Sequence, residues 1–531
     1  MAEGRARPIT PARVMMLSCT LAAGLLAFLL LPPIRATPGL VGGFLGAGSL
    51  LVAWAAALAM ALRRAGRTLT LEPIARKHHW VQACAQLTLL LYWGWHVRPV
   101  YAFLPFVVAQ LLFAYGLDAL LNWTRRGRWQ LGFGPVPIVL SINFFLWFKP
   151  QWFYWQFVIV LLGYVGKEFI RWTRDGRRRH IFNPSSFPLA VFSLVLILTG
   201  TTDATFGLEI ASTLFNPPHI YVAIFLVALP AQVLFGVTTM TIASVLTAYA
   251  WGLVYFAATG TYYFRDAFIP IAVFLGMHLL FTDPSTSPRT ESGRVVFGAL
   301  YAIATIALAA VLEAVGAPTF YDKLLPIPLL NLTVRRIDRV ADAVAAARWR
   351  AWALGEVLTS ARRRLAVVGL WVATFVVMSE TGALGDEHPG QYLPFWEESC
   401  EAGSERACEY MTVMQENYCD RGSGWACNEL GIQRTLRSRD RDAALASMRR
   451  GCDLEFRTAC ENLGRMRRGE GRLARARPEL RDLPIVLRGS KGPVMERTAT
   501  ELFELGCRRG WPDLCTRTTR IGPDASRQAA P

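Results

Sequence analysis

Long apolar runs separated by short polar loops dominate the first 315 residues of the chain. They cover residues 14–31, 41–62, 80–97, 100–121, 135–148, 151–170, 187–200, 220–236, 238–260, 267–282 and 295–315. Helical runs of about 20 apolar residues match the thickness of a bilayer, and 53% of all residues are hydrophobic. Because helices satisfy their own backbone hydrogen bonds in lipid, we expect an all-α, polytopic membrane protein with about 11 to 13 crossings.

The positive charges between these runs predict which loops face the cytoplasm. The net charge is +17, and arginine-rich clusters follow the second, fourth, sixth and tenth runs, at 63–77, 125–128, 171–179 and 289–294. Since basic loops stay on the cytoplasmic side, the N-terminus and the even-numbered loops are predicted to be cytoplasmic. The lipid bilayer thus explains the excess charge, and no basic groove with interleaved aromatic residues indicates nucleic acid as a partner.

The segment after the eleventh run is the least regular part of the predicted membrane region. Charge parity leaves the chain outside, yet arginines are dense again at 335–364. We therefore predict an irregular twelfth crossing at 320–334, broken by Pro326 and Pro328. Residues 335–364 are then a basic amphipathic helix along anionic headgroups. A thirteenth crossing at 365–380 places the C-terminus outside.

Eight of the ten cysteines lie after residue 399, in four pairs with one spacing. Zinc sites use shorter ligand spacings, and residues eight apart on one straight helix lie about 12 Å apart, too far for a disulfide. The chain must therefore turn between the two cysteines of a pair. Gly403, Gly422 and Gly510 stand where such a turn between helices is expected. The pairs are Cys400/Cys408, Cys419/Cys427, Cys452/Cys460 and Cys507/Cys515.

The tail from about residue 395 to 520 resembles cysteine-rich, tetratricopeptide-like bacterial repeats, with ACNELG and ACENLG around the second cysteine of two pairs. The resemblance implies that a disulfide joins adjoining helices in each pair; reduced buried thiols are the alternative. Disulfides need an oxidising compartment, which agrees with the outside C-terminus predicted from charge. We expect a periplasmic helical repeat domain that binds a protein partner, as such solenoids commonly do.

A polar loop between the tenth and eleventh runs contains groups that bind anions. It reads DPSTSPRTESGR from Asp283 to Arg294, with several hydroxyls and two arginines. Pro284 ends the preceding helix at Asp283. Such a loop is either a plain connector or a clamp for an anion such as phosphate, and composition leaves both interpretations open.

Three motifs in one order give the membrane part a family resemblance. The chain reads HIFNP at 180–184, TDPSTSP at 282–288 and GRVVFGA at 293–299. Residues 80–340 resemble the NqrB/RnfD family of membrane electron-transport subunits, which carry HxFNPA, TDPVTSP and GRLIFGA in these places. RnfD-like proteins associated with enediyne biosynthetic clusters look closest. The resemblance implies a multi-pass subunit of the bacterial inner membrane that transfers electrons through flavin mononucleotide (FMN), with other redox subunits and a quinone as partners.

In that family, FMN is joined by a phosphoester to the threonine of an outer S-x-A-T motif. The corresponding loop here reads Thr202-Asp203-Ala204-Thr205, so the resemblance predicts Thr205 as the attachment residue and Thr202 beside it. Asp203 adds negative charge next to a phosphate, and an ordinary polar turn is the alternative. The resemblance also implies a polar centre that binds cofactor, made of Asn183, Asp283, Thr286, Arg289 and Arg294.

Other ionisable residues in the apolar runs have simpler interpretations. His278 is interpreted as a packing histidine rather than a haem or quinone ligand. Lys167 and Glu168 lie at the cytoplasmic end of the sixth run, where long side chains reach the interface.

The predicted function is electron transport through a flavin, coupled to cation movement. Two alternatives remain: a cofactor-free transporter or exporter, linked to natural-product biosynthesis, and a membrane anchor that displays a protein-binding repeat. The chain carries no nicotinamide fingerprint, so electrons from NADH would arrive through another protein. The predicted domains are an N-terminal hairpin with its basic loop (1–79), the NqrB/RnfD-like domain (80–340), an amphipathic helix with the last crossing (341–385) and the repeat domain (386–531).

Overall fold

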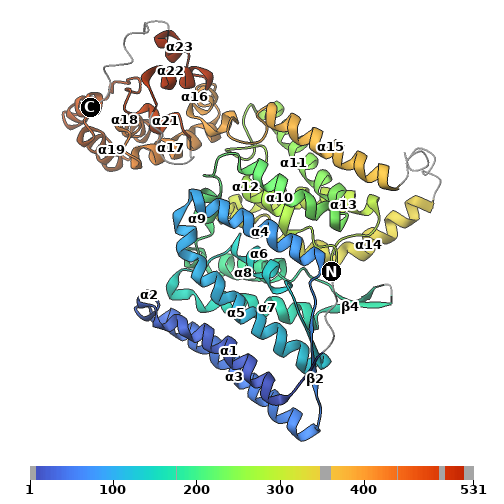
Figure 1. Ribbon diagram of the computed structural model, residues 1–531. Coiled ribbons are helices and arrows are strands. Elements are labelled where there is room, and N and C mark those ends of the chain that lie inside the picture. The colour runs from blue at the N-terminus through green and yellow to red at the C-terminus, as the bar shows by residue number, and fades with distance from the viewer. Residues whose placement is uncertain (1–6, 175, 347–359, 439, 490–496, 519–531) are drawn as a thin grey trace. The chain divides into compact units, whose positions relative to one another are not determined.

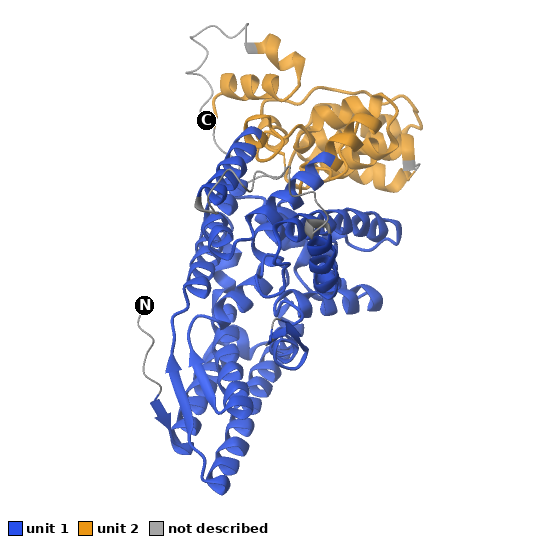
Figure 2. Cartoon of the chain, turned by 90° about the vertical axis from the view of Figure 1, so that its right-hand side faces the viewer, with its two compact units in different colours: residues 1–250, 271–377 blue, residues 251–270, 378–531 orange. Residues whose placement is uncertain are grey.

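The computed structural model describes residues 7–174, 176–346, 360–438, 440–489 and 497–518. It divides into two compact units, coloured separately in Figure 2. The first unit comprises residues 1–250 and 271–377, and the second comprises residues 251–270 and 378–531. Helices make up most of both units, and the strands in the described residues are five short ones. The expected all-α fold class is confirmed at this level.

The first unit is a set of packed helices joined by short loops (Figure 1). Its helices are α1 (Pro11–Ala27), α2 (Pro32–Arg35), α3 (Pro38–Ala65), α4 (Lys77–His96), α5 (Arg98–Arg126), α6 (Pro135–Asn143), α7 (Tyr154–Phe169), α8 (Ser186–Thr199), α9 (Gly207–Leu214), α10 (Ile220–Phe235), α11 (Thr238–Thr259), α12 (Ile271–Leu275) continued by a π-helical turn, η4 (Gly276–Leu280), α13 (Glu291–Ala314), α14 (Pro326–Ala346) and α15 (Ser360–Glu380). The C-terminal ends of α11 and α15 belong to the second unit.

Five helices in the described residues are long and apolar enough to cross a membrane. Three further apolar helices are shorter, at Ser186–Thr199, Ile220–Phe235 and Ile271–Leu280. The long ones are Pro11–Leu30, Pro38–Ala65, Arg98–Arg126, Thr238–Thr259 and Glu291–Ala314.

The apolar run at 135–148 forms only a half-helix. Helix α6 has 9 residues, about 14 Å and so roughly half the hydrocarbon thickness. The chain then leaves the helix, and a buried amide satisfies its backbone: Gln156 Nε2 donates to the carbonyl of Leu146 (3.2 Å), and Gln156 Oε1 accepts from the N–H of Phe148 (3.1 Å). Irregular backbone buried away from water is tolerated here because protein groups supply its hydrogen bonds.

Short strands join several of the loops that the charge pattern assigned to one side. Strands β1 (Arg7–Ile9), β2 (Leu69–Pro73) and β3 (Arg128–Leu131) form one sheet in that order. Strand β1 is antiparallel to β2, and β2 is parallel to β3. The N-terminal segment and the loops after the second and fourth runs therefore lie together.

The loop after the sixth run joins the same end of the unit. Strands β4 (Arg171–Arg174) and β5 (Arg177–His180) form a hairpin. Glu168, just before this hairpin, is 9% exposed and forms an ion pair with Arg126 at the end of α5. Glu168 therefore anchors the hairpin to the loop after the fourth run.

Helix α14 differs from the irregular crossing predicted at 320–334. Pro326 is its first residue and Pro328 lies in its first turn, where a missing N–H breaks no hydrogen bond. The helix then continues without interruption to Ala346, so the predicted basic helix at 335–364 begins as part of it. Residues 347–359 of that prediction lie outside the described residues.

The second unit contains eight helices in its described residues after 390, and four disulfides. Cys400–Cys408, Cys419–Cys427, Cys452–Cys460 and Cys507–Cys515 are bonded in the predicted pairs. Each bond joins the end of one helix to the next. The helices are α16 (Leu393–Glu401), α17 (Glu405–Asp420), α18 (Gly424–Gln433), α19 (Arg441–Asp453), α20 (Arg457–Arg467), α21 (Leu483–Val486), α22 (Ala499–Arg508) and α23 (Pro512–Thr518).

The same turn recurs inside all four disulfide loops. The third residue after the first cysteine has a positive φ in each: 97° at Gly403, 101° at Gly422, 59° at Glu455 and 97° at Gly510. Its N–H donates to the carbonyl of that cysteine every time, at 2.8 to 3.2 Å. Glycine adopts this conformation without steric cost, and Glu455 shows that the turn forms at one position without it.

The loop after the ninth run belongs to the second unit. Its Tyr262 ring lies 4.6 Å from the ring of Phe395 and 4.3 Å from that of His388. Arg406 donates to the carbonyl of Tyr263 at 2.8 Å. The predicted NqrB/RnfD-like domain (80–340) includes this loop, whereas its aromatic side chains pack with the cysteine-rich tail.

Candidate functional site

The two motif segments HIFNP and DPSTSP meet in the first unit. Asn183 is 6% exposed, and its Nδ2 donates to the carbonyl of Leu280 at 2.9 Å. Asn331 of α14 joins the two segments: its Oδ1 accepts from the N–H of Asn183 (3.2 Å) and its Nδ2 donates to the carbonyl of Thr286 (3.2 Å). Three segments far apart in sequence are thereby held by buried amide hydrogen bonds.

A contact between the side chains of His180 and Asp283 joins the same segments. His180 Nε2 lies 3.3 Å from Asp283 Oδ2, and the N–H of Ser285 donates to Asp283 Oδ1 at 2.9 Å. Burial opposes ionisation of Asp283, but the hydrogen bonds from His180 and Ser285 outweigh it and lower the pKa of this carboxyl. Asp283 is therefore a fixed negative charge at neutral pH.

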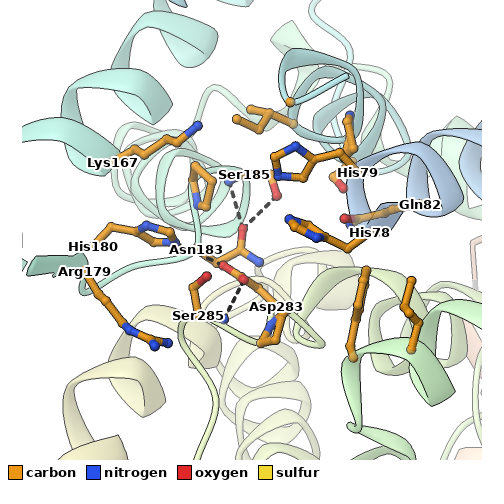
Figure 3. A pocket seen from close by; sticks show the side chains of 18 of the residues that line it. His78, His79, Gln82, Lys167, Arg179, His180, Asn183, Ser185, Asp283 and Ser285 are labelled. Atoms are coloured by element: carbon orange, nitrogen blue, oxygen red, sulfur yellow. Dashed lines mark hydrogen bonds and ion pairs between the residues drawn. The ribbon is translucent and has the colours of Figure 1, made fainter. Parts of the chain in front are cut away.

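Around this junction lies a chamber of about 430 Å³, shown in Figure 3. This volume falls in the range of about 300–1,000 Å³ that is usual for ligand pockets. Three cationic side chains, Lys77, Lys167 and Arg179, line it together with Asp283. The chamber thus has more positive than negative charge. Its histidines are His78, His79 and His180, and its apolar lining includes Pro137, Ile138, Leu234 and Phe235.

Of the five residues predicted for a polar centre, the chamber brings together Asn183 and Asp283. Thr286 is 1% exposed and does not line the chamber. Its carbonyl accepts a hydrogen bond from Asn331 Nδ2. Arg289 donates its backbone N–H to Asp338 at 2.9 Å, and Arg294 pairs with Glu291 at 2.7 Å. Neither arginine lines the chamber; both stabilise the loop and the start of α13.

Thr202 and Thr205 lie in a different place, beside a cavity of about 160 Å³. Thr205 is 3% exposed, and its hydroxyl donates to the carbonyl of Thr202 at 3.0 Å. The cavity is smaller than about 300 Å³, the low end for ligand pockets, and Asp203 and Glu209 add negative charge to its lining. In this conformation the residues do not fit FMN attached at Thr205.

Sequence reasoning missed the residues that build the chamber from outside the motifs. Asn331 is fully buried. The sequence feature that could have indicated its role is that it is a single amide in an apolar stretch. His78 and His79, whose rings lie 4.4 Å apart, follow the basic cluster at 63–77, and that setting gave no sign of a pocket. Lys167 lines the chamber.

His278 has the environment of a packing residue. It is 1% exposed, its Nδ1 lies 2.7 Å from the carbonyl of Phe274, and its ring stacks 5.9 Å from that of Trp371. These contacts hold the imidazole within the helix packing of the first unit.

No family model, curated protein or solved structure matches the chain. The NqrB/RnfD resemblance therefore stays a prediction from the motifs. What the chain can bind is argued below from the chemistry of the chamber.

Proposed function

We propose that the chain is a membrane electron-transport subunit of the NqrB/RnfD type that binds FMN non-covalently in the chamber. The observation that supports this most is the convergence of both motif segments on one cavity of about 430 Å³. Its apolar lining, with Ile138 and Phe235, suits a planar ring system, and Lys77, Lys167 and Arg179 suit a phosphate. Bound FMN would supply the redox chemistry, while the protein binds and orients it.

A cofactor-free anion transporter is the second candidate. Two half-helices meet at the chamber: α6 contributes Pro137, Ile138 and Ser141 to the lining, and η4 leads directly into Asp283. Broken helices at a ligand site are typical of secondary transporters. The same cationic lining would then bind a transported anion without any redox chemistry.

We also propose that the first unit spans the bacterial inner membrane and that the second unit is periplasmic. The β1–β3 sheet joins the N-terminal segment to the loops after the second and fourth runs, and the His180–Asp283 contact joins the loops after the sixth and tenth runs. Their positive charge favours the cytoplasm. The second unit includes residues 251–270, which are the end of the ninth run and the loop after it, and its four disulfides favour an oxidising compartment. There it would bind a protein partner.

Thiol labelling in intact cells tests this orientation. In a Cys19→Ala/Cys84→Ala background, which removes the two free cysteines, a membrane-impermeant maleimide is expected to label the protein only after treatment with an impermeant reductant. Labelling without reductant would show free thiols. Labelling that requires permeabilised cells would place the tail in the cytoplasm.

Flavin content tests the proposed function. Protein purified in detergent after co-expression with a flavin transferase is expected to carry FMN that acid precipitation releases into the supernatant. Lys167→Met should lower its occupancy at least about tenfold, because removing one charge-assisted hydrogen bond to phosphate costs about 1.5–3 kcal/mol. The matched variant Thr205→Val should leave occupancy unchanged.

Three other outcomes would each redirect the proposal. Flavin that stays on the denatured chain and is lost in Thr205→Val would move the cofactor to Thr205. Flavin-free protein that binds inorganic phosphate in a Lys167-dependent way would support the transporter. Protein that binds neither would remove both functions from the chamber.

A further inference from the structure

A second cavity, of about 500 Å³, is formed entirely by residues of the cysteine-rich unit. Two indole rings form part of its wall, those of Trp425 and Trp511, with centroids 6.1 Å apart and planes at 80°. Trp425 Nε1 donates to the carbonyl of Ala476 at 2.7 Å, and Trp511 Nε1 lies 3.4 Å from Glu397 Oε2. Both rings are therefore held in fixed orientations with apolar surface next to a carboxylate.

The buried charge of this cavity is negative. Glu429 of α18 is 5% exposed, and its Oε1 accepts from Asn428 Nδ2 at 3.1 Å. The guanidinium of Arg475 lies 3.8 Å from Glu429 Oε2 and is 55% exposed. A carboxylate this buried needs a close cationic partner to be charged at low cost, and at 3.8 Å Arg475 supplies only part of that.

The other charged groups around the cavity do not complete the pairing of Glu429. Arg477 is 68% exposed and pairs with Asp513 at 2.7 Å, while Glu401 and Arg517 also line the cavity. Burial raises the pKa of Glu429 to about 7, although Arg475 and Asn428 lower it, and Glu397 adds to the rise. Burial also raises the pKa of Glu397. The buried Glu429 and the partly buried Glu397 are thus short of positive charge, and the arginines lie toward solvent.

We propose that this cavity binds a primary ammonium group, with Glu429 and Glu397 as its anionic partners. The faces of Trp425 and Trp511 would pack against the alkyl chain and attract the charge. A cation of this kind supplies up to three N–H donors in a small volume, which two carboxylates can share. The ammonium comes either from a lysine side chain of a protein partner or from a free alkylamine. This inference does not depend on the proposed role of the first unit.

Ligand binding by the full-length protein in detergent tests the inference. The probes are n-butylamine and a blocked lysine peptide, acetyl-Gly-Lys-Gly-amide; the same peptide with acetyl-lysine is the neutral control. We expect saturable binding of a primary amine, at least tenfold weaker in Glu429→Gln and unchanged in Glu416→Gln, whose side chain is 51% exposed in its pair with Arg434. The acetyl-lysine peptide should not bind.

Proton release provides a readout that a purely structural role would not change. Near pH 7, binding an ammonium should ionise Glu429, so calorimetry in buffers of different ionisation enthalpy should report a released proton that Glu429→Gln abolishes. Binding of the lysine peptide alone would identify a protein partner as the source, and binding of both probes would show that a free amine suffices. Absence of saturable binding, or equal affinity and proton release in Glu429→Gln, would overturn the inference.

Discussion

Leucine in place of Asn183 is expected to destabilise the first unit by about 3–5 kcal/mol and to abolish ligand binding in the chamber. The side chain of Asn183 accepts from the N–H groups of Ser185 (2.9 Å) and Ser186 (3.1 Å) and donates to the carbonyl of Leu280 (2.9 Å). Leucine has a similar volume but makes none of these bonds. Each buried backbone group left unsatisfied costs about 1–3 kcal/mol. The loss of the monodisperse peak in size-exclusion chromatography after heating measures the change.

Two further variants separate this effect from a general loss of packing. Ser185→Ala removes one hydroxyl that donates to the same Asn183 Oδ1 at 2.8 Å, so about 1 kcal/mol is expected. Asn331→Leu breaks the links to Asn183 and Thr286. Combined with Asn183→Leu, it should cost less than the sum of the two changes, because both residues hold the same segments together. A melting temperature for Asn183→Leu equal to that of Ser185→Ala would contradict this account.

Features that a repeated sequence pattern encodes were predictable from the sequence. The turn between the two cysteines of each pair follows from a steric requirement, because a C-x7-C pair can bond only across a turn, and three of the four turns carry glycine; the bonds themselves were expected from the resemblance to cysteine-rich repeats. Glu455 occupies the fourth turn with φ 59°. The convergence of HIFNP with DPSTSP, however, was expected from the family resemblance rather than from any property of the residues themselves.

Features that depend on single buried contacts were not predictable. The apolar run at 135–148 is long enough for a crossing, and hydrophobicity does not record that the chain leaves the helix after Asn143. The side chain that permits this, Gln156, lies in the next run. Asn331 likewise has no neighbour in sequence that indicates its role, and the packing of Tyr262 with Phe395 joins segments more than a hundred residues apart.

The ionisation of Glu429 makes the stability of the second unit depend on pH. Burial raises the folded-state pKa to about 7 from the ordinary glutamate value of 4.5. Below pH 4.5 the carboxyl is protonated in both states. Between pH 4.5 and 7 the folded state holds a proton that the unfolded state releases, so stability falls as pH rises. Above pH 7 this loss amounts to about 3 kcal/mol.

Glutamine at position 429 should therefore stabilise the second unit by up to about 3 kcal/mol at pH 8 and change it little at pH 4. Glutamine keeps one oxygen that accepts from Asn428, replaces the other with an NH2 group and removes the charge. Hydrogen exchange of peptides from residues 424–467 in the full-length protein measures the effect locally. Glu416→Gln, at an exposed ion pair, should change stability by less than about 1 kcal/mol. If Glu429 binds an ammonium ligand, saturating lysine peptide should stabilise the wild-type second unit at pH 8 and have no effect on Glu429→Gln. Equal hydrogen-exchange protection of wild type and Glu429→Gln at pH 8, measured without peptide, would contradict the raised pKa of Glu429.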